Sequence, residues 1–153
     1  MRVVADTNVL VSALMRIGTP PARLFDACLD GLFELVFTPD TLQELRLVLV
    51  RPHIAKVLRF SPRRVLAIIQ QIEQTAIVVT PAKKLNVIKK DPSDNRVIEA
   101  AVFGGAKYVI SGDKAILELG DAGYHGIRFV SPAEFEDIFL DDKYGLTSGK
   151  RAA

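Results

Sequence analysis

The chain has 153 residues, of which 49% are hydrophobic and 25% are charged, and its formal net charge is +2 at pH 7. This length and balance predict one globular domain with a packed core, and they exclude a disordered or fibrous protein. The mildly basic charge permits a nucleic-acid partner without requiring one, and a single cysteine, Cys28, excludes a disulfide framework and a thiolate metal site.

The first half of the chain contains two predicted strands, each a short apolar run, at residues 2–6 and 32–38. Thr38-Pro39 then begins an amphipathic helix, because a threonine hydroxyl can cap a helix and proline suits its first position. Ser61-Pro62 begins a second amphipathic helix in the same way. The apolar residues 76–79 form either a further short strand or a cover for the core.

The second half of the chain repeats this alternation. Asp91-Pro92 opens a helix that ends at Gly104-Gly105, since glycine commonly follows the last helical turn, and a predicted strand at residues 107–111 comes next. After a strand at residues 127–130, Ser131-Pro132 begins a last helix. The pattern predicts the α/β class, specifically a three-layer α/β/α domain around a central, mostly parallel sheet.

The composition changes near the C-terminal end. We predict one domain over residues 1–140 and a flexible tail over residues 141–153, where apolar residues give way to Gly, Ser, Lys and Asp. No apolar stretch approaches the roughly 20 residues that span a bilayer, and the first residues lack a signal-peptide pattern. We therefore expect a cytoplasmic protein that does not enter a membrane.

Four acidic side chains occupy positions that a parallel sheet would bring to one edge. Asp6 and Asp113 follow predicted strands, Glu44 lies on the helix after the second strand, and Asp94 stands in the first turn of a later helix. The ligand crevice of such a sheet lies outside the carboxyl ends of its strands. Clustered ionised carboxylates repel one another unless a cation lies between them, and ligands that are all oxygen favour Mg²⁺ or Mn²⁺.

Each acid also has a purely structural explanation. Asp113, considered alone, is better explained as the N-cap of a following short helix. Asp91 and Asp94 are explained as the cap and an early acid of one helix, and for Asp91 we accept this explanation. Glu44 alone is explained as a solvated charge balanced by a nearby arginine. Asp6 is the hardest to explain in this way, because the residues on both sides of it are apolar.

Four motifs, in this order along the chain, contain these acids: Asp6-Thr7-Asn8, Glu44 in a Thr-Pro-x-x-x-x-Glu-Leu helix, Asp91-Pro-x-Asp-Asn95, and Ser111-Gly-Asp-Lys114. Together they resemble the PIN domain, in particular the prokaryotic toxin components of toxin–antitoxin pairs (VapC-like ribonucleases). The resemblance extends from about Met1 to Leu140. One departure is Ala115-Ile116, where the family often has Asp-Leu.

The resemblance implies an endoribonuclease that depends on one or two Mg²⁺ or Mn²⁺ ions. Its catalytic and metal-binding residues would be Asp6, Glu44, Asp94 and Asp113. Residues that would support them are Asn8 and Ser111, and more weakly Thr7 and Asn95. The resemblance further implies an RNA substrate, an antitoxin partner and a homodimer. Arg96 is the strongest of many basic candidates for a contact with substrate phosphate, although each of them alone is explained as an ordinary surface charge.

Other functions compete with this hypothesis. An α/β phosphohydrolase that forms an aspartyl phosphate on Asp6 would need a second acid two residues later, and the chain has Asn8 there. A receiver-like signalling module would need a phospho-acceptor after a middle strand, and the strand at residues 32–38 ends without one. A non-catalytic PIN-fold binding module is disfavoured because all four acidic positions are present.

Overall fold

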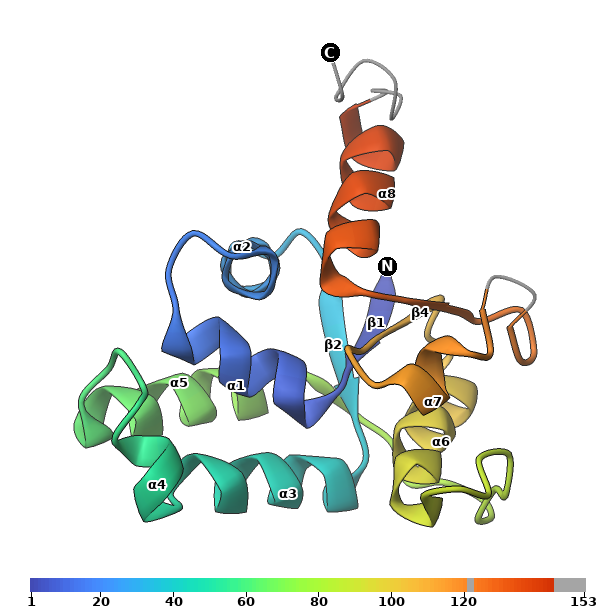
Figure 1. Cartoon of the computed structure of the whole chain (residues 1–153), viewed down its shortest axis with the longest axis horizontal. Coiled ribbons are helices and arrows are strands. Elements are labelled where there is room, and N and C mark those ends of the chain that lie inside the picture. Colours follow the sequence, from blue (N-terminus) through green and yellow to red (C-terminus); the bar gives the residue numbers. More distant parts are fainter. Residues whose placement is uncertain (121–122, 145–153) are drawn as a thin grey trace.

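A parallel sheet of five strands, in the order β3-β2-β1-β4-β5, forms the centre of the protein (Figure 1). The computed structural model describes residues 1–120 and 123–144. All neighbouring strands pair in parallel. The strands are β1 (Arg2–Ala5), β2 (Glu34–Phe37), β3 (Ile77–Val78), β4 (Tyr108–Ile110) and β5 (Arg128–Val130). The four predicted strands are confirmed, and the ambiguous run at residues 76–79 contains the edge strand β3.

Helices connect the strands, and those predicted from a hydroxyl residue followed by proline begin where expected. Thr38 and Ser61 each accept a hydrogen bond from a backbone N–H in the first helical turn, and Thr19-Pro20 begins a further helix by the same device. The helices are α1 (Thr7–Met15), α2 (Pro20–Leu29), α3 (Pro39–Leu49), α4 (Pro52–Ala55), α5 (Pro62–Thr75), the 3₁₀ turn η1 (Pro92–Asp94), α6 (Asn95–Gly104), α7 (Lys114–Leu117) and α8 (Pro132–Tyr144).

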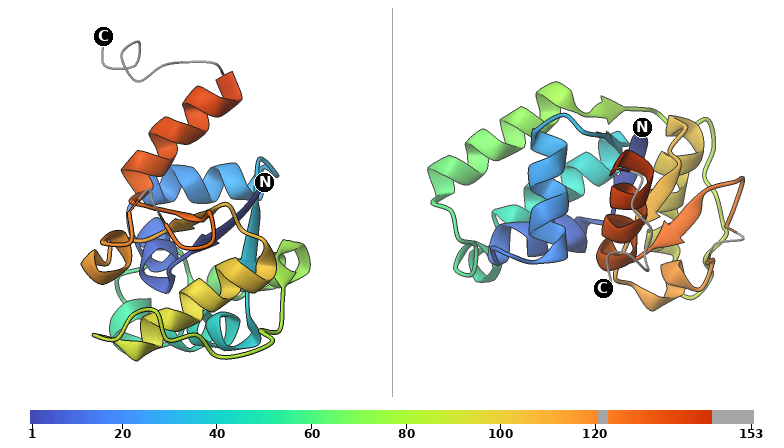
Figure 2. Two further views of the ribbon diagram at one scale, coloured as in Figure 1. Left: turned by 90° about the vertical axis from the view of Figure 1, so that its right-hand side faces the viewer. Right: turned by 90° about the horizontal axis from the view of Figure 1, so that it is seen from above.

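Two apolar cores cover the two faces of the sheet. Along β2, Leu35 and Phe37 enter one core and Val36 enters the other, because successive strand residues point to opposite faces. The first core is built by α1, α2, α3, α5 and α8, and the second by α6 and α7. This arrangement, visible in Figure 1 and Figure 2, is the predicted three-layer α/β/α fold.

The close approach of α6 to the sheet depends on a glycine. A Cβ atom at Gly104 would collide with the Cγ1 atom of Val36, a nearly fully buried and stiff side chain on β2. Gly105 follows with φ +66° and ends the helix in the left-handed region, as the Gly-Gly pair predicted. Helix α6 therefore lies directly against the sheet, and its first turn has a fixed position at the carboxyl edge.

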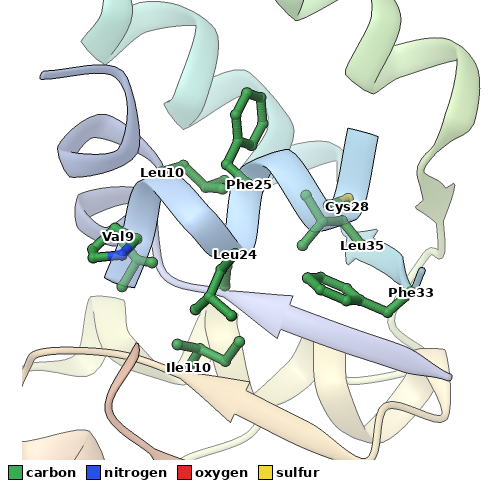
Figure 3. A pocket seen from close by; sticks show the side chains of 10 residues that line it. Val9, Leu10, Leu24, Phe25, Cys28, Phe33, Leu35 and Ile110 are labelled. Atoms are coloured by element: carbon green, nitrogen blue, oxygen red, sulfur yellow. The ribbon is translucent and has the colours of Figure 1, made fainter. Parts of the chain in front are cut away.

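A small apolar cavity lies between the α1–α2 pair and the sheet (Figure 3). Its volume is about 10 Å³, which is space for about one water molecule at most. Cys28 lines it together with Leu24, Phe25 and Phe33. Burial raises the pKa of the Cys28 thiol to about 11, so this cysteine is a core residue and not a nucleophile.

Helix α8 extends beyond the predicted domain boundary. It continues to Tyr144, so the first four residues of the predicted tail are helical, and residues 145–153 lie outside the described residues. The Nε atom of Arg23 on α2 pairs with Glu136 on α8 at 2.6 Å, which holds the two helices together. No helix in the described part of the chain is both long and apolar enough to cross a lipid bilayer.

Candidate active site

The strand order reverses between β1 and β4. The chain moves from β1 to β2 and β3 on one side of the sheet, and then returns to β4 on the other side. A parallel sheet binds ligands outside its carboxyl edge at such a switch point. Ala5 pairs with Ile110 at the ends of these two strands, so the residues that follow, Asp6 and Ser111, lie next to each other at this edge.

Asp6 is held at the end of β1 by its backbone and by its side chain. Its N–H donates to the carbonyl of Ile110 at 2.9 Å, and its carboxylate accepts a hydrogen bond from the Ser111 hydroxyl at 2.9 Å. Although Asp6 precedes α1, its side chain makes no capping hydrogen bond to that helix. The backbone of Asn8, in the first turn of α1, still acts on this carboxylate, and together with the bond from Ser111 it opposes the rise of the Asp6 pKa.

Ser111 joins the two loops that carry Asp6 and Asp113. Its side chain is fully buried, and while its hydroxyl donates to Asp6, the same oxygen accepts the N–H of Asp113 at 2.9 Å. Asp113 in turn accepts the N–H of Ala115 at 2.8 Å and caps α7. The structural explanation for Asp113 is thus confirmed. The cap also places this carboxylate beside the other acids.

Glu44 extends from α3 toward the edge of the sheet that carries Asp6. The buried hydroxyl of Thr7 donates to its carboxylate at 3.0 Å, which ties α3 to the start of α1. Of the two arginines that could have balanced Glu44, Arg46 and Arg51, the first pairs with Glu73 at 2.6 Å instead. Thr7, which was predicted to support the acids, thus contacts one of them, Glu44.

The four acids act on one another electrostatically. The pKa of Asp94 is raised from 3.8 to about 6, first by burial and then by the negative charges of Asp113, Asp91, Asp6 and Glu44. Burial also raises the pKa of Asp6, and the charges of Glu44 and Asp113 add to this effect against the opposing hydrogen bond from Ser111. The structure thus brings Asp6, Glu44, Asp94 and Asp113 to one edge of the sheet.

The four carboxylates lie at the same edge of the sheet, but they are not arranged as a complete set of metal ligands. Among the side chains that the structure describes, no three acidic, histidine or cysteine groups lie close enough together to hold a metal ion as they stand. The donors at this edge are nevertheless all oxygen atoms, which suits a hard divalent cation and not zinc. The chemistry of the donor set therefore fits Mg²⁺ or Mn²⁺.

Asn95 has a different role from the one predicted. Its buried amide donates to the carbonyls of Ile88 and Pro92, at 2.7 and 3.1 Å, and accepts the N–H groups of Val87 and Ile88, at 2.9 and 2.8 Å. The side chain of Asn95 thereby uses both of its donors and both of its acceptor positions on backbone groups of the preceding loop and of the first residue of η1. Asn95 therefore fixes that loop and does not support the carboxylates.

Two further predicted residues, Asn8 and Arg96, are each two positions away in the sequence from one of the acids. Asn8 is exposed at the start of α1 and Arg96 is exposed at the start of α6.

Sequence reasoning missed Glu99, which is buried and accepts the N–H of Leu85 at 2.8 Å. Its spacing of four residues from Asn95 was the available signal, because such residues share one face of a helix.

The fold is an α/β domain with four acidic side chains at the carboxyl edge of a parallel sheet. A family model described as PIN domain matches residues 2–115, and the chain belongs to this family. PIN domains are generally nucleases and typically use divalent metals. The PIN domain expected from the four motifs is therefore confirmed.

One relative extends the similarity over almost the whole chain. The uncharacterized protein MJ1680 of Methanocaldococcus jannaschii is 26% identical over 145 residues, which is 91% of this chain and 92% of the relative. The similarity therefore continues beyond residue 115. Because MJ1680 is itself uncharacterized, it adds no information about substrate or partner.

Proposed function

We propose that the protein is a Mg²⁺- or Mn²⁺-dependent endoribonuclease. The observation that carries this proposal is the position of Asp6, Glu44, Asp94 and Asp113 at the carboxyl edge of the sheet, where Ser111 donates a hydrogen bond to Asp6 and Thr7 donates one to Glu44. Such an arrangement destabilises the metal-free protein, because ionised carboxylates at a half-buried edge repel one another. A divalent cation between them would remove this repulsion.

Asp6, Glu44, Asp94 and Asp113 would hold the cation or cations. A bound ion would supply an activated water molecule and would neutralise charge that develops on the phosphate. The contribution of the chain is to orient the donors: Ser111 directs Asp6, and Thr7 directs Glu44. Outer partners of this kind typically change metal affinity or activity by about 10–100-fold when they are removed.

The same geometry disfavours the competing phosphohydrolase. An aspartyl-phosphate mechanism on Asp6 would need an acid two residues later to protonate the leaving group. That position holds Asn8, which is exposed and has no acidic proton. In the proposed nuclease no protein side chain has to act as the nucleophile.

The test is cleavage of an end-labelled single-stranded RNA by the purified protein, with Mn²⁺ or with excess chelator. We expect cleavage with Mn²⁺, loss of cleavage in chelator and recovery when Mn²⁺ is restored. The activity should coelute with the protein on gel filtration, which controls for a contaminating nuclease. Cleavage that persists in chelator would contradict metal dependence, and intact RNA under all conditions would favour a non-catalytic binding module.

The narrower parts of the proposal are a toxin role, an antitoxin partner and a homodimer. They are supported by the resemblance of the four motifs to those of PIN-domain toxins. A protein partner or a second copy would cover large apolar residues that are exposed on or directly after α3, after α4 and on α5. These are Leu47, Val50, Val57 and Leu66.

A further inference from the structure

The segment between β3 and η1 follows the edge of the sheet that carries the acids. Because the strands are parallel, β3 ends at the same edge as β1 and β4. The N–H of Val79 donates to the carbonyl of Phe37 there, at 2.9 Å. From this point the chain crosses to η1 and α6, and it reaches Asp94 at the end of η1 (Figure 1, yellow-green). Residues 80–91, here called the lysine loop, therefore lie along the carboxyl edge.

The middle of the lysine loop is anchored to α6. Glu99 accepts the N–H of Leu85, Asn95 accepts those of Val87 and Ile88, and the Ile88 side chain is buried in the second core. Two buried polar side chains of α6 thus accept hydrogen bonds from three of the four backbone N–H groups of residues 85–88. The loop has a defined position despite its lack of regular structure.

Pairs of lysines flank this anchored stretch on both sides. Lys83 and Lys84 precede it, and Lys89 and Lys90 follow it. All four are exposed, and within the described residues the ion pairs join other side chains, Arg23 with Glu136 and Arg46 with Glu73. The loop therefore carries four lysines and one acid, Asp91, directly before the acidic site.

A surface pocket of about 400 Å³ connects the lysine loop to the first turn of α6. Lys84 and Asn86 line it from the loop, and Ser93 and Arg96 line it from η1 and α6. Ser93 directly precedes Asp94 in the sequence. Two acids also line the pocket: Glu99 is engaged by a loop N–H, whereas Asp40, on α3, would oppose an anion.

We propose that the lysine loop and Arg96 bind the phosphates of a single-stranded RNA next to the phosphate that is cleaved. This inference rests on the proposed nuclease function, because it gives the substrate strand a path beside the carboxylates. The division of charge is physically consistent: the acids hold a cation, while the anchored lysines neutralise the backbone of the strand. Arg96, at the pocket wall, would contact the phosphate closest to Asp94.

The test is binding of a short fluorescent single-stranded RNA to the full chain in chelator, followed by anisotropy at several salt concentrations. We expect Lys83→Ala/Lys84→Ala and Lys89→Ala/Lys90→Ala each to weaken binding at least about 10-fold at low salt. Each pair should also reduce the salt slope by about 1.4, since each of the two neutralised phosphates of a single strand contributes about 0.7. The matched control is Arg63→Ala/Arg64→Ala, which removes two exposed charges from the start of α5 and should bind like the wild type.

Equal losses in the control and in the lysine variants would overturn the inference, as would wild-type binding by the lysine variants or no binding by the wild type. Because the measurement involves no cleavage, its failure is separable from failure of the proposed function. RNA that binds through the loop but is never cut would support the inference and contradict the nuclease. RNA that is cut equally well and bound equally tightly by the lysine variants would contradict the inference alone.

Discussion

Replacement of Asp6 by asparagine is expected to lower the rate of RNA cleavage by at least about 100-fold, because loss of a direct donor should cost no less than loss of an outer partner. The substitution removes the negative charge and keeps the shape of the side chain. The amide oxygen can still accept the hydrogen bond that Ser111 now donates to Asp6. Initial cleavage rates with Mn²⁺, and circular dichroism to verify the fold, provide the measurement.

The matched control for Asp6 is Asp26→Asn. Asp26 is exposed on α2 and does not contribute to the raised pKa of Asp6 or Asp94. Both variants lose one negative charge, so a general effect of charge on RNA binding would appear in both. Cleavage at the wild-type rate by Asp6→Asn, or an equal loss in Asp26→Asn, would contradict the assignment of Asp6 to the site.

Asp94→Asn is expected to remove cleavage, again by at least about 100-fold, and at the same time to stabilise the metal-free protein. The folded state raises the pKa of Asp94 from 3.8 to about 6, so the folded protein binds this proton more tightly than the unfolded chain. Its contribution to stability therefore falls as the pH rises between these two values, and the full penalty is present above pH 6. Because Asp94 is only half-buried, we expect a gain of about 1 kcal/mol or less, which is a rise of up to about 4 °C in Tm.

Thermal unfolding in chelator, at about pH 7.5 and about pH 4, measures this gain. The variant should melt above the wild type at the higher pH, and the difference should shrink at the lower pH, where the wild-type carboxyl is protonated. Added Mn²⁺ should raise the Tm of the wild type more than that of the variant. A variant that melts below the wild type at high pH, or that cleaves RNA normally, would be inconsistent with a strained carboxylate site.

The elements of the fold could be predicted because their signals are local. A hydroxyl residue followed by proline marked the starts of α3, α5 and α8, and the Gly104-Gly105 pair marked the end of α6. Helix α2 was not predicted, although it also begins with a hydroxyl residue followed by proline, Thr19-Pro20. The end of the domain was placed too early, since the polar residues 141–144 continue α8.

The site could be predicted only in part, because convergence depends on packing between distant segments. Asp6 and Asp113 could be assigned to one edge, since each follows a strand of a parallel sheet. The link between them through Ser111, and the contact of Thr7 with Glu44, require the register of β1 against β4 and the position of α3. The motif containing Asn95 suggested a role beside the acids, whereas its burial against the lysine loop directs its amide to backbone groups.

The central claim is that four carboxylates at one edge of the sheet share a hard cation. The most direct test is the location of Mn²⁺ by its anomalous scattering in crystals of the wild-type protein grown with the metal. We predict an anomalous peak within coordination distance of Asp6 and of at least one of Asp94 and Asp113. Mn²⁺ that binds elsewhere, or a crevice without Mn²⁺ at saturating concentration, would contradict the account.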